Sequence, residues 1–152
     1  MTGSLDIAVQ AEGWPDCAAI AERAIAAVAA ELEGPREGEL SLVLSDDAQI
    51  RVLNRDYRHK DKATNVLSFP QSGPEAGMML GDIILARETV EREASDKNVS
   101  FEAHLTHLII HGWLHLQGFD HETEVEAAEM ESIEISALAT LGIDNPYQVS
   151  DD

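Results

Sequence analysis

The spacing of apolar and polar residues along the chain predicts short strands that alternate with helices. From residue 40 to residue 45, leucines alternate with serine or valine, the period of two that is typical of a strand. Longer stretches repeat apolar residues every three to four positions, which favours amphipathic helices. The expected strands are residues 5–9, 40–45, 66–69 and 78–85. The expected helices are residues 16–32, 46–58, 87–96, 101–117 and 123–141.

The order of these elements favours one α+β domain over residues 1–152, built as a small mixed four-stranded sheet packed with helices. A chain of 152 residues, of which 44% are apolar, can bury one core. The sequence contains no internal repeat and no linker that would separate two domains. The helix expected at residues 101–117 is apolar on nearly every side apart from its histidines, so we expect it to be buried in that core.

Charge is distributed unevenly along the chain. The formal net charge of −19 argues against general binding to DNA or to an anionic membrane. Half of the ten basic residues nevertheless lie between positions 51 and 62. They are Arg51, Arg55, Arg58, Lys60 and Lys62. The three arginines fall on one face of the expected helix, where they form either a solvated charged surface or a surface for phosphate groups.

The sequence has no feature that points to secretion or to a membrane. The amino terminus lacks a basic segment followed by an apolar one, and no stretch approaches the ~18 apolar residues of a membrane span. We therefore expect a cytoplasmic protein with no membrane partner. Cys17 is the only cysteine, so no intrachain disulfide can form and a buried apolar role is expected for it.

Three histidines near the end of the buried helix have the spacing of a metal site. His111 and His115 lie four residues apart in the segment HGWLHLQGFDH, so they project from the same face of a helix. His121 can join them only if the helix stops and the chain turns back, and Gly118 is suited to end it. Three imidazoles that leave one position open are typical of catalytic zinc sites. The sequence therefore predicts one Zn²⁺ per chain, held by these three histidines.

The histidine segment departs from the zinc-peptidase pattern HExxHxxGxxH at one position. Gly112 stands where the peptidases carry the glutamate that acts as general base. The zincin-like metal site is thus retained without the peptidase proton acceptor. A structural zinc would need a fourth ligand, such as Asp120. His104 and His107 are interpreted as core histidines with hydrogen-bond partners, and His107, one turn before His111, is also a candidate to support a ligand.

The last expected helix carries a run of glutamates that we assign to its exposed face. The run comprises Glu122, Glu124, Glu126, Glu129, Glu131 and Glu134. The inward face of the same helix is expected to carry Val125, Ile133, Leu138 and Leu141.

Three ordered segments of the chain resemble the YbeY family of bacterial endoribonucleases. They are NRDYRHKDKATNVLSFP at residues 54–70, GDI at residues 81–83 and the histidine segment at residues 111–121. The resemblance implies a zinc-dependent endoribonuclease that cuts single-stranded ribosomal RNA in ribosomal RNA maturation and ribosome quality control. It implies the ribosome or ribosomal proteins as further partners. It also implies metal ligands at His111, His115 and His121 and a functional arginine at Arg58.

Two residues depart from the pattern common in that family, since Asn65 stands in place of an aspartate and Phe119 in place of a tyrosine. The Arg58 guanidinium suits the stabilisation of charge on a phosphodiester, whereas peptide hydrolysis calls for the missing glutamate. Asp82 and Asp120 are candidates to orient a ligand or to assist proton transfer, and Asp120 could instead cap a turn. A zinc metallopeptidase and a non-catalytic ribosome assembly factor with a structural zinc are the alternatives to the nuclease.

Overall fold

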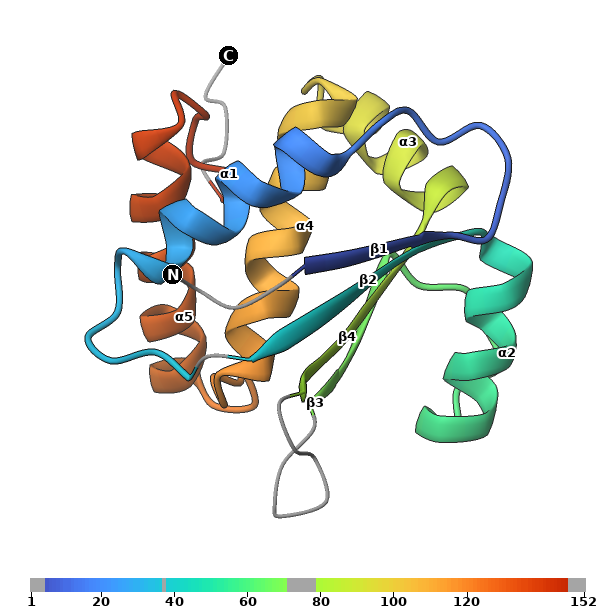
Figure 1. The fold of residues 1–152 in the computed structure, drawn as a ribbon, viewed down its shortest axis with the longest axis horizontal. Coiled ribbons are helices and arrows are strands. Elements are labelled where there is room, and N and C mark those ends of the chain that lie inside the picture. The colour runs from blue at the N-terminus through green and yellow to red at the C-terminus, as the bar shows by residue number, and fades with distance from the viewer. Residues whose placement is uncertain (1–4, 37, 71–78, 148–152) are drawn as a thin grey trace.

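Four strands and five helices are present in residues 5–36, 38–70 and 79–147, the part of the chain that the computed structural model describes (Figure 1). The strands are β1 (Leu5–Val9), β2 (Glu39–Ser45), β3 (Val66–Pro70) and β4 (Met79–Ala86). The helices are α1 (Ala18–Ala29), α2 (Asp47–Arg58), α3 (Arg87–Asp96), α4 (Phe101–Leu116) and α5 (Glu124–Thr140). The expected α+β class is confirmed, and the bounds of most elements agree with the predicted ones within two residues.

Helix α1 is shorter than the helix expected over residues 16–32. At its start the Asp16 carboxylate accepts a hydrogen bond from the Ala18 N–H at 3.1 Å, a local turn that keeps Asp16 outside the helix. At its end the N–H groups of Glu31 and Leu32 bond carbonyl oxygens three residues back instead of four. Residue 78, where β4 was expected to begin, lies outside the described residues.

The sheet is mixed, as expected, with the strand order β1-β2-β4-β3. Strands β1, β2 and β4 are parallel, and β3 pairs with β4 in the antiparallel direction. Because β3 lies at the edge of the sheet, one of its sides is not covered by another strand.

Alternate residues of the strands contribute to two apolar clusters on opposite faces of the sheet. Leu42 and Leu44 of β2 belong to the main core, together with residues of α1, α4 and α5. Val43, between them, packs against the smaller cluster that contains Ile50 of α2. Successive side chains of a strand point to opposite faces, so α2 covers the face opposite α4.

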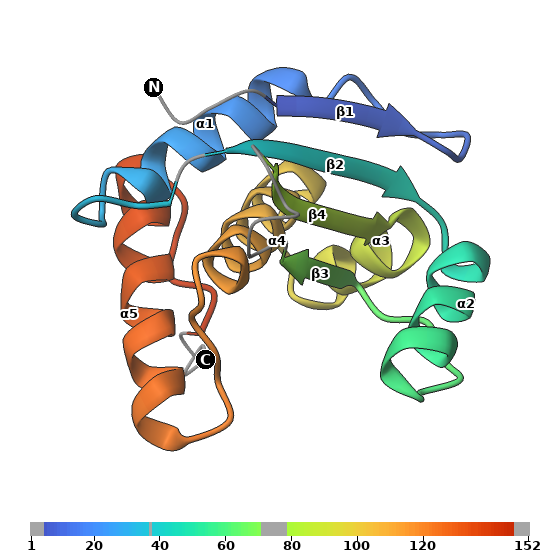
Figure 2. The same cartoon turned by 60° about the horizontal axis from the view of Figure 1, so that its bottom comes forward.

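Helix α4 is the buried histidine-bearing helix that the sequence predicts. It contacts α1, α3 and α5 as well as β3 and β4, and it runs through the middle of the helical layer (Figures 1 and 2). From His104 to Leu116 every residue is buried except His111 and His115. After its first turn, these two half-buried histidines are therefore the places where this helix reaches the surface.

The chain reverses at the end of α4 through a glycine, as predicted. Gly118 has a φ of 99°, in the left-handed region that favours glycine. The Gly118 N–H donates to the His115 carbonyl oxygen, and the Phe119 N–H donates to that of Leu114, each at 3.0 Å. This pair of bonds is a Schellman motif, which ends the helix and sends the next residues back along it.

Gly112 allows α4 to approach the sheet closely. A Cβ atom at this position would lie 3.0 Å from both Ile83 Cγ2 and Ser68 Oγ. The Ser68 hydroxyl also donates a hydrogen bond to the Gly112 carbonyl oxygen at 3.2 Å. Position 112 therefore faces strands β3 and β4, and a glutamate there would collide with the sheet.

The expected faces of α5 are wrong at two positions. Val125, expected to point inward, is 78% exposed, and Glu134, assigned to the exposed face, is fully buried. Glu134 lies between Met130 and Leu138, both buried, with a spacing of four residues on either side. It therefore belongs to the inward stripe of the helix, where hydrogen bonds to His107 and His111 of α4 compensate for its burial.

None of the helices in the described part of the chain has the length and apolar content that crossing a membrane requires.

Candidate metal centre

The three predicted ligands come together at one end of α4. His111 and His115 project from the last turns of the helix, and His121 returns to them from the segment after Gly118. A nitrogen atom from each ring lies within 4.8 Å of a nitrogen of the other two. The ring of His121 is centred 5.6 Å from that of His111 and 5.1 Å from that of His115. The geometry therefore groups the three imidazoles that the spacing predicts.

Hydrogen bonds leave the Nε2 atoms of both helical histidines facing each other. His111 Nδ1 lies 2.8 Å from a carboxylate oxygen of Glu134, and His115 Nδ1 lies 2.9 Å from the Phe119 carbonyl oxygen. Both oxygens are acceptors, so a ring proton on Nδ1 would satisfy each of these contacts. The two Nε2 atoms lie 3.1 Å apart. Two Nε2 atoms that both lack a proton cannot form a hydrogen bond with each other. Two ligand nitrogens that each lie about 2.0–2.1 Å from one metal ion are, however, separated by a similar distance.

The environment also keeps His115 neutral. Burial, followed by the neighbouring His111, lowers the pKa of His115 below its usual value, although the bond to the Phe119 carbonyl works in the opposite direction. A neutral imidazole is the form that binds a metal. The donor set thus fits a metal ion.

Glu134 is the residue of this site that the sequence analysis missed. Its two carboxylate oxygens accept hydrogen bonds from His107 and His111, each at 2.8 Å, and from the Tyr147 hydroxyl. Burial alone would raise its pKa, but these bonds outweigh burial and lower the pKa of Glu134 to about 2. A signal for it exists in the sequence, since Glu134 interrupts the apolar stripe of Met130, Ala137 and Leu138.

The other two histidines of α4 have partners, as expected. His104 Nε2 lies 2.8 Å from a carboxylate oxygen of Glu93, and the same oxygen accepts a bond from the Asn65 side chain at 3.0 Å. His107 binds Glu134 and so supports His111 through that carboxylate. His104 is therefore a satisfied core residue, whereas His107 contributes to the metal centre indirectly.

A cleft of about 710 Å³ opens in front of the histidines, between α4 and the edge strand β3. Its basic side chains are Arg58, Lys60 and Lys62, and it is also lined by His111, His115 and His121. Arg58 Nη2 donates to the Ser68 carbonyl oxygen at 2.6 Å, and its guanidinium carbon lies 5.3 Å from the centre of the Phe69 ring. The end of α2 therefore brings the predicted functional arginine into the same cleft as the predicted ligands.

The remaining arginines of the basic segment lie outside this cleft. Arg51 pairs with Asp61 at 2.8 Å and Arg55 pairs with Asp56 at 3.0 Å, both on the exposed surface. Of the two interpretations left open for Arg51 and Arg55, these contacts favour the solvated charged face.

The two aspartates singled out in the sequence differ in position. Asp120 lines the cleft, and its carboxylate accepts the His121 N–H at 2.8 Å, which favours the turn-capping interpretation. Asp82 lies on β4 and does not line the cleft, and burial raises its pKa. Neither geometry identifies a general base.

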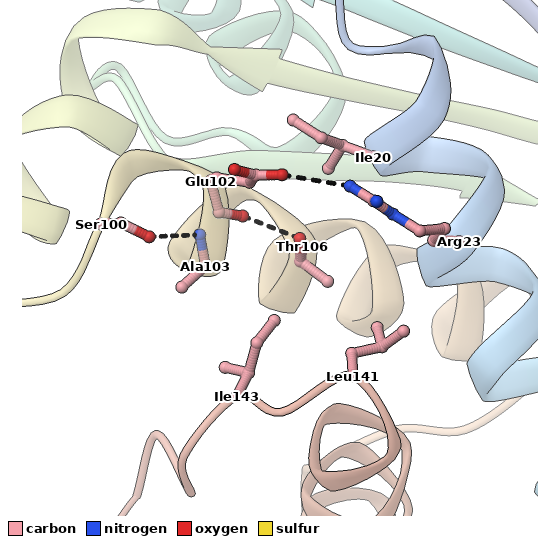
Figure 3. Close-up of a pocket in the computed structure, with 8 residues that line it drawn as sticks. All are labelled: Ile20, Arg23, Ser100, Glu102, Ala103, Thr106, Leu141 and Ile143. Atoms are coloured by element: carbon pink, nitrogen blue, oxygen red, sulfur yellow. Dashed lines mark hydrogen bonds and ion pairs between the residues drawn. The ribbon is translucent and has the colours of Figure 1, made fainter.

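A second cavity, of about 340 Å³, lies near the start of α4 (Figure 3). Arg23 of α1 and Glu102 of α4 form an ion pair of 3.1 Å at its rim, and Ser100 caps α4 by accepting the Ala103 N–H. Leu141 and Ile143 supply apolar surface. The cavity contains none of the histidines and is separate from the candidate metal centre.

Fold and site together define a single-domain α+β protein with a three-histidine cluster, able to hold a metal ion, in a cleft that carries both basic and acidic side chains. The family model of endoribonuclease YbeY matches residues 8–142. An endoribonuclease YbeY of Agrobacterium fabrum is 51% identical, with 94% of each chain covered. Another from Azorhizobium caulinodans is 52% identical, over 94% of this chain and 95% of the relative. The chain belongs to the endoribonuclease YbeY family.

A solved structure shares the fold. The solution structure of a Thermotoga maritima protein is 23% identical in sequence, covers 97% of each chain and superposes with a TM-score of 0.59. At this identity the likeness concerns the fold alone.

Proposed function

We propose that this chain is a zinc-dependent endoribonuclease, a single metal-dependent hydrolase domain that cuts single-stranded regions of ribosomal RNA. The proposal includes a role in ribosomal RNA maturation and ribosome quality control in the cytoplasm, with the ribosome or ribosomal proteins as further partners. It assigns one zinc ion to His111, His115 and His121 and a catalytic role to Arg58. The observation that carries it is the convergence of those four side chains on one cleft.

The histidines would hold the metal through nitrogen, the ligand type that zinc accepts readily. A zinc ion bound there would supply Lewis-acid chemistry for hydrolysis of a phosphodiester. His111 and His115 present Nε2, because their Nδ1 atoms face Glu134 and the Phe119 carbonyl oxygen. His121 is exposed and approaches from the cleft side.

Arg58 would bind the phosphate that reacts. Among the described residues its guanidinium donates to the Ser68 carbonyl oxygen, so several N–H groups of the fork are left for a phosphate. The guanidinium would stabilise the negative charge that develops on the phosphate oxygens. Lys60 and Lys62 would hold neighbouring phosphates of the strand.

An exposed aromatic residue beside Arg58 supports a single-stranded substrate. Tyr57 is 66% exposed, and its ring packs edge-on against Phe69 with the two centres 5.6 Å apart. Unpaired bases stack on such rings, whereas bases inside a duplex are not available to do so.

Two other functions are less well supported. A zinc metallopeptidase would need a proton acceptor next to His111, but Gly112 packs on the sheet and leaves no room for one. An assembly factor with a structural zinc would be expected to close the site with a fourth protein ligand. Within the described residues the cluster contains three candidate ligands and opens into a cleft.

The test is to offer one zinc-loaded preparation a single-stranded RNA, the same RNA in a duplex, and casein. We expect cleavage of the single strand, little cleavage of the duplex and none of casein. His115→Ala serves as the contamination control, because it removes a ligand and should abolish the activity. Cleavage of casein alone, lost in that control, would support the peptidase instead, and zinc binding without any cleavage would support the assembly factor.

A further inference from the structure

A buried carboxylate connects the metal centre to the C-terminal part of the chain. Among the described residues, Glu134 Oε2 faces His111 Nδ1 alone, whereas Oε1 faces both His107 Nε2 and the Tyr147 hydroxyl. Glu134 is fully buried and Tyr147, beyond the end of α5, is 40% exposed. One residue of α5 thus receives three donors, two of them from α4.

The arrangement indicates where the protons are. A carboxylate that accepts three hydrogen bonds is ionised, so His107, His111 and Tyr147 all act as donors. His107 Nδ1 is buried without a hydrogen-bond partner among the described residues. A proton on that atom would be an unsatisfied buried donor, so the proton that His107 donates to Glu134 is carried on Nε2.

We propose that Glu134, held in place by His107 and Tyr147, is a positioning residue that keeps the proton of His111 on Nδ1 and so leaves Nε2 free to bind the metal. Neutral imidazole can carry its proton on either nitrogen, and a proton on Nε2 would block the ligand atom. The inference rests on the metal site of the proposed function, and it adds Glu134, His107 and Tyr147 to that site.

An isosteric substitution separates this role from simple packing. In Glu134→Gln the side chain keeps its size but has one acceptor end and one donor end. The amide oxygen should take the place of Oε1, where two donors converge, and the amide nitrogen should then face His111. Nδ1 of His111 must accept from that nitrogen, which moves the ring proton to Nε2.

The first measurement is the tautomer of His111, read from the ¹⁵N chemical shifts of its imidazole in the metal-free protein. We expect the proton on Nδ1 in the wild type and on Nε2 in Glu134→Gln. The same tautomer in both proteins would overturn the proposal, and this result does not depend on whether zinc is the natural metal.

The second measurement is zinc affinity, by competition with a chromophoric chelator. We expect Glu134→Gln to bind zinc roughly 10–100-fold more weakly, the usual effect of losing the partner of a ligating histidine. Tyr147→Phe should weaken binding by a smaller factor, because it removes one donor and leaves the carboxylate. If Glu134→Gln does not fold, Tyr147→Phe decides the question, since zinc affinity equal to that of the wild type would then overturn the proposal.

The chain offers a matched control, a glutamate of α3. Glu93 also accepts a hydrogen bond from a buried histidine of α4, His104, at 2.8 Å, but that histidine is not a metal ligand. Glu93→Gln should leave zinc affinity and the His111 tautomer unchanged, and an equal loss of affinity in this variant would overturn a specific role for Glu134. A wild type that binds no zinc would instead overturn the proposed function.

Discussion

Arg58 and Gly112, which lie on different helices, are joined through one serine of the edge strand. The Arg58 guanidinium donates to the Ser68 carbonyl oxygen at 2.6 Å, and the Ser68 hydroxyl donates to the Gly112 carbonyl oxygen at 3.2 Å. Gly112 directly follows the candidate ligand His111. Strand β3 therefore fixes the candidate catalytic arginine relative to the turn of α4 that carries the candidate ligand His111.

Substitution of Arg58 should separate metal binding from cleavage. We expect Arg58→Ala to retain zinc and fold but to lose on the order of 10²-fold in the rate of RNA cleavage, because charge stabilisation is removed and no ligand is. Arg58→Lys should restore little of the cleavage rate, since an ammonium group lacks the bidentate fork of a guanidinium. Arg55→Ala, on the same helix but outside the cleft, is the control, and wild-type turnover by Arg58→Ala would exclude the assigned role.

Removal of one ligand should release the metal. His115→Ala leaves two imidazoles, too few for a stable zinc site, so the variant should contain almost no zinc after a chelator wash. Elemental analysis of the purified protein checks this. His104→Gln, a substitution on the same helix away from the site, should keep one zinc per chain. Full zinc occupancy in His115→Ala would show that the ligand assignment is wrong.

The lysines of the cleft should account for the salt dependence of RNA binding. Each phosphate contact to single-stranded RNA contributes a slope of about 0.7 to the fall of log affinity with log salt. We expect Lys60→Gln with Lys62→Gln to reduce the measured slope by about that amount per lost contact. Arg51→Gln with Arg55→Gln should change it less, because those arginines pair with Asp61 and Asp56 outside the cleft. If the arginine pair reduced the slope more than the lysine pair, the RNA would instead lie on the outer face of α2.

A single added methyl group should disturb the contact between α4 and the sheet. In Gly112→Ala the new Cβ would lie 3.0 Å from Ile83 Cγ2 and from Ser68 Oγ. Such overpacking should lower the free energy of unfolding by about 1–3 kcal/mol, measured by denaturant titration. Ser68→Ala in the same chain should relieve part of the added cost, in a double-mutant cycle. Stability equal to that of the wild type would mean that the cost of overpacking is no larger than the roughly 1 kcal/mol by which alanine is favoured over glycine inside a helix.

Burial of His104 should make stability depend on pH. Burial lowers its pKa below 6.5, although the bond to Glu93 acts in the opposite direction and Lys97 and His107 also face the ring. The unfolded chain therefore takes up this proton first as the pH falls below about 6.5, so acid favours unfolding. The contribution is at most about 1.4 kcal/mol per pH unit.

The comparison is between the metal-free wild type and His104→Gln, unfolded with denaturant between pH 7 and pH 5. The wild type should lose stability more steeply than the variant. The lowered pKa of Glu93 acts only below its usual value of 4.5, outside this range. Parallel curves for the two proteins would show that His104 does not contribute.

The local parts of this protein could be predicted from its sequence. The period of two in β2, the apolar character of α4 and the glycine after it are properties of neighbouring residues, and each led to the element that the structure contains. The histidine spacing also predicted the cluster of three imidazoles, because His111 and His115 share one helical face and Gly118 reverses the chain to bring in His121. Such features depend on backbone geometry over a dozen residues.

Tertiary structure alone decided which charged residues belong to the site. Glu134 looks like one more glutamate of an acidic helix, but three donors from distant parts of the chain make it stable in the core as a carboxylate. Arg58 enters the cleft while Arg51 and Arg55 remain outside, because the end of α2 lies beside β3. A buried charge depends on partners brought together by packing, and residue spacing along one helix does not contain that information.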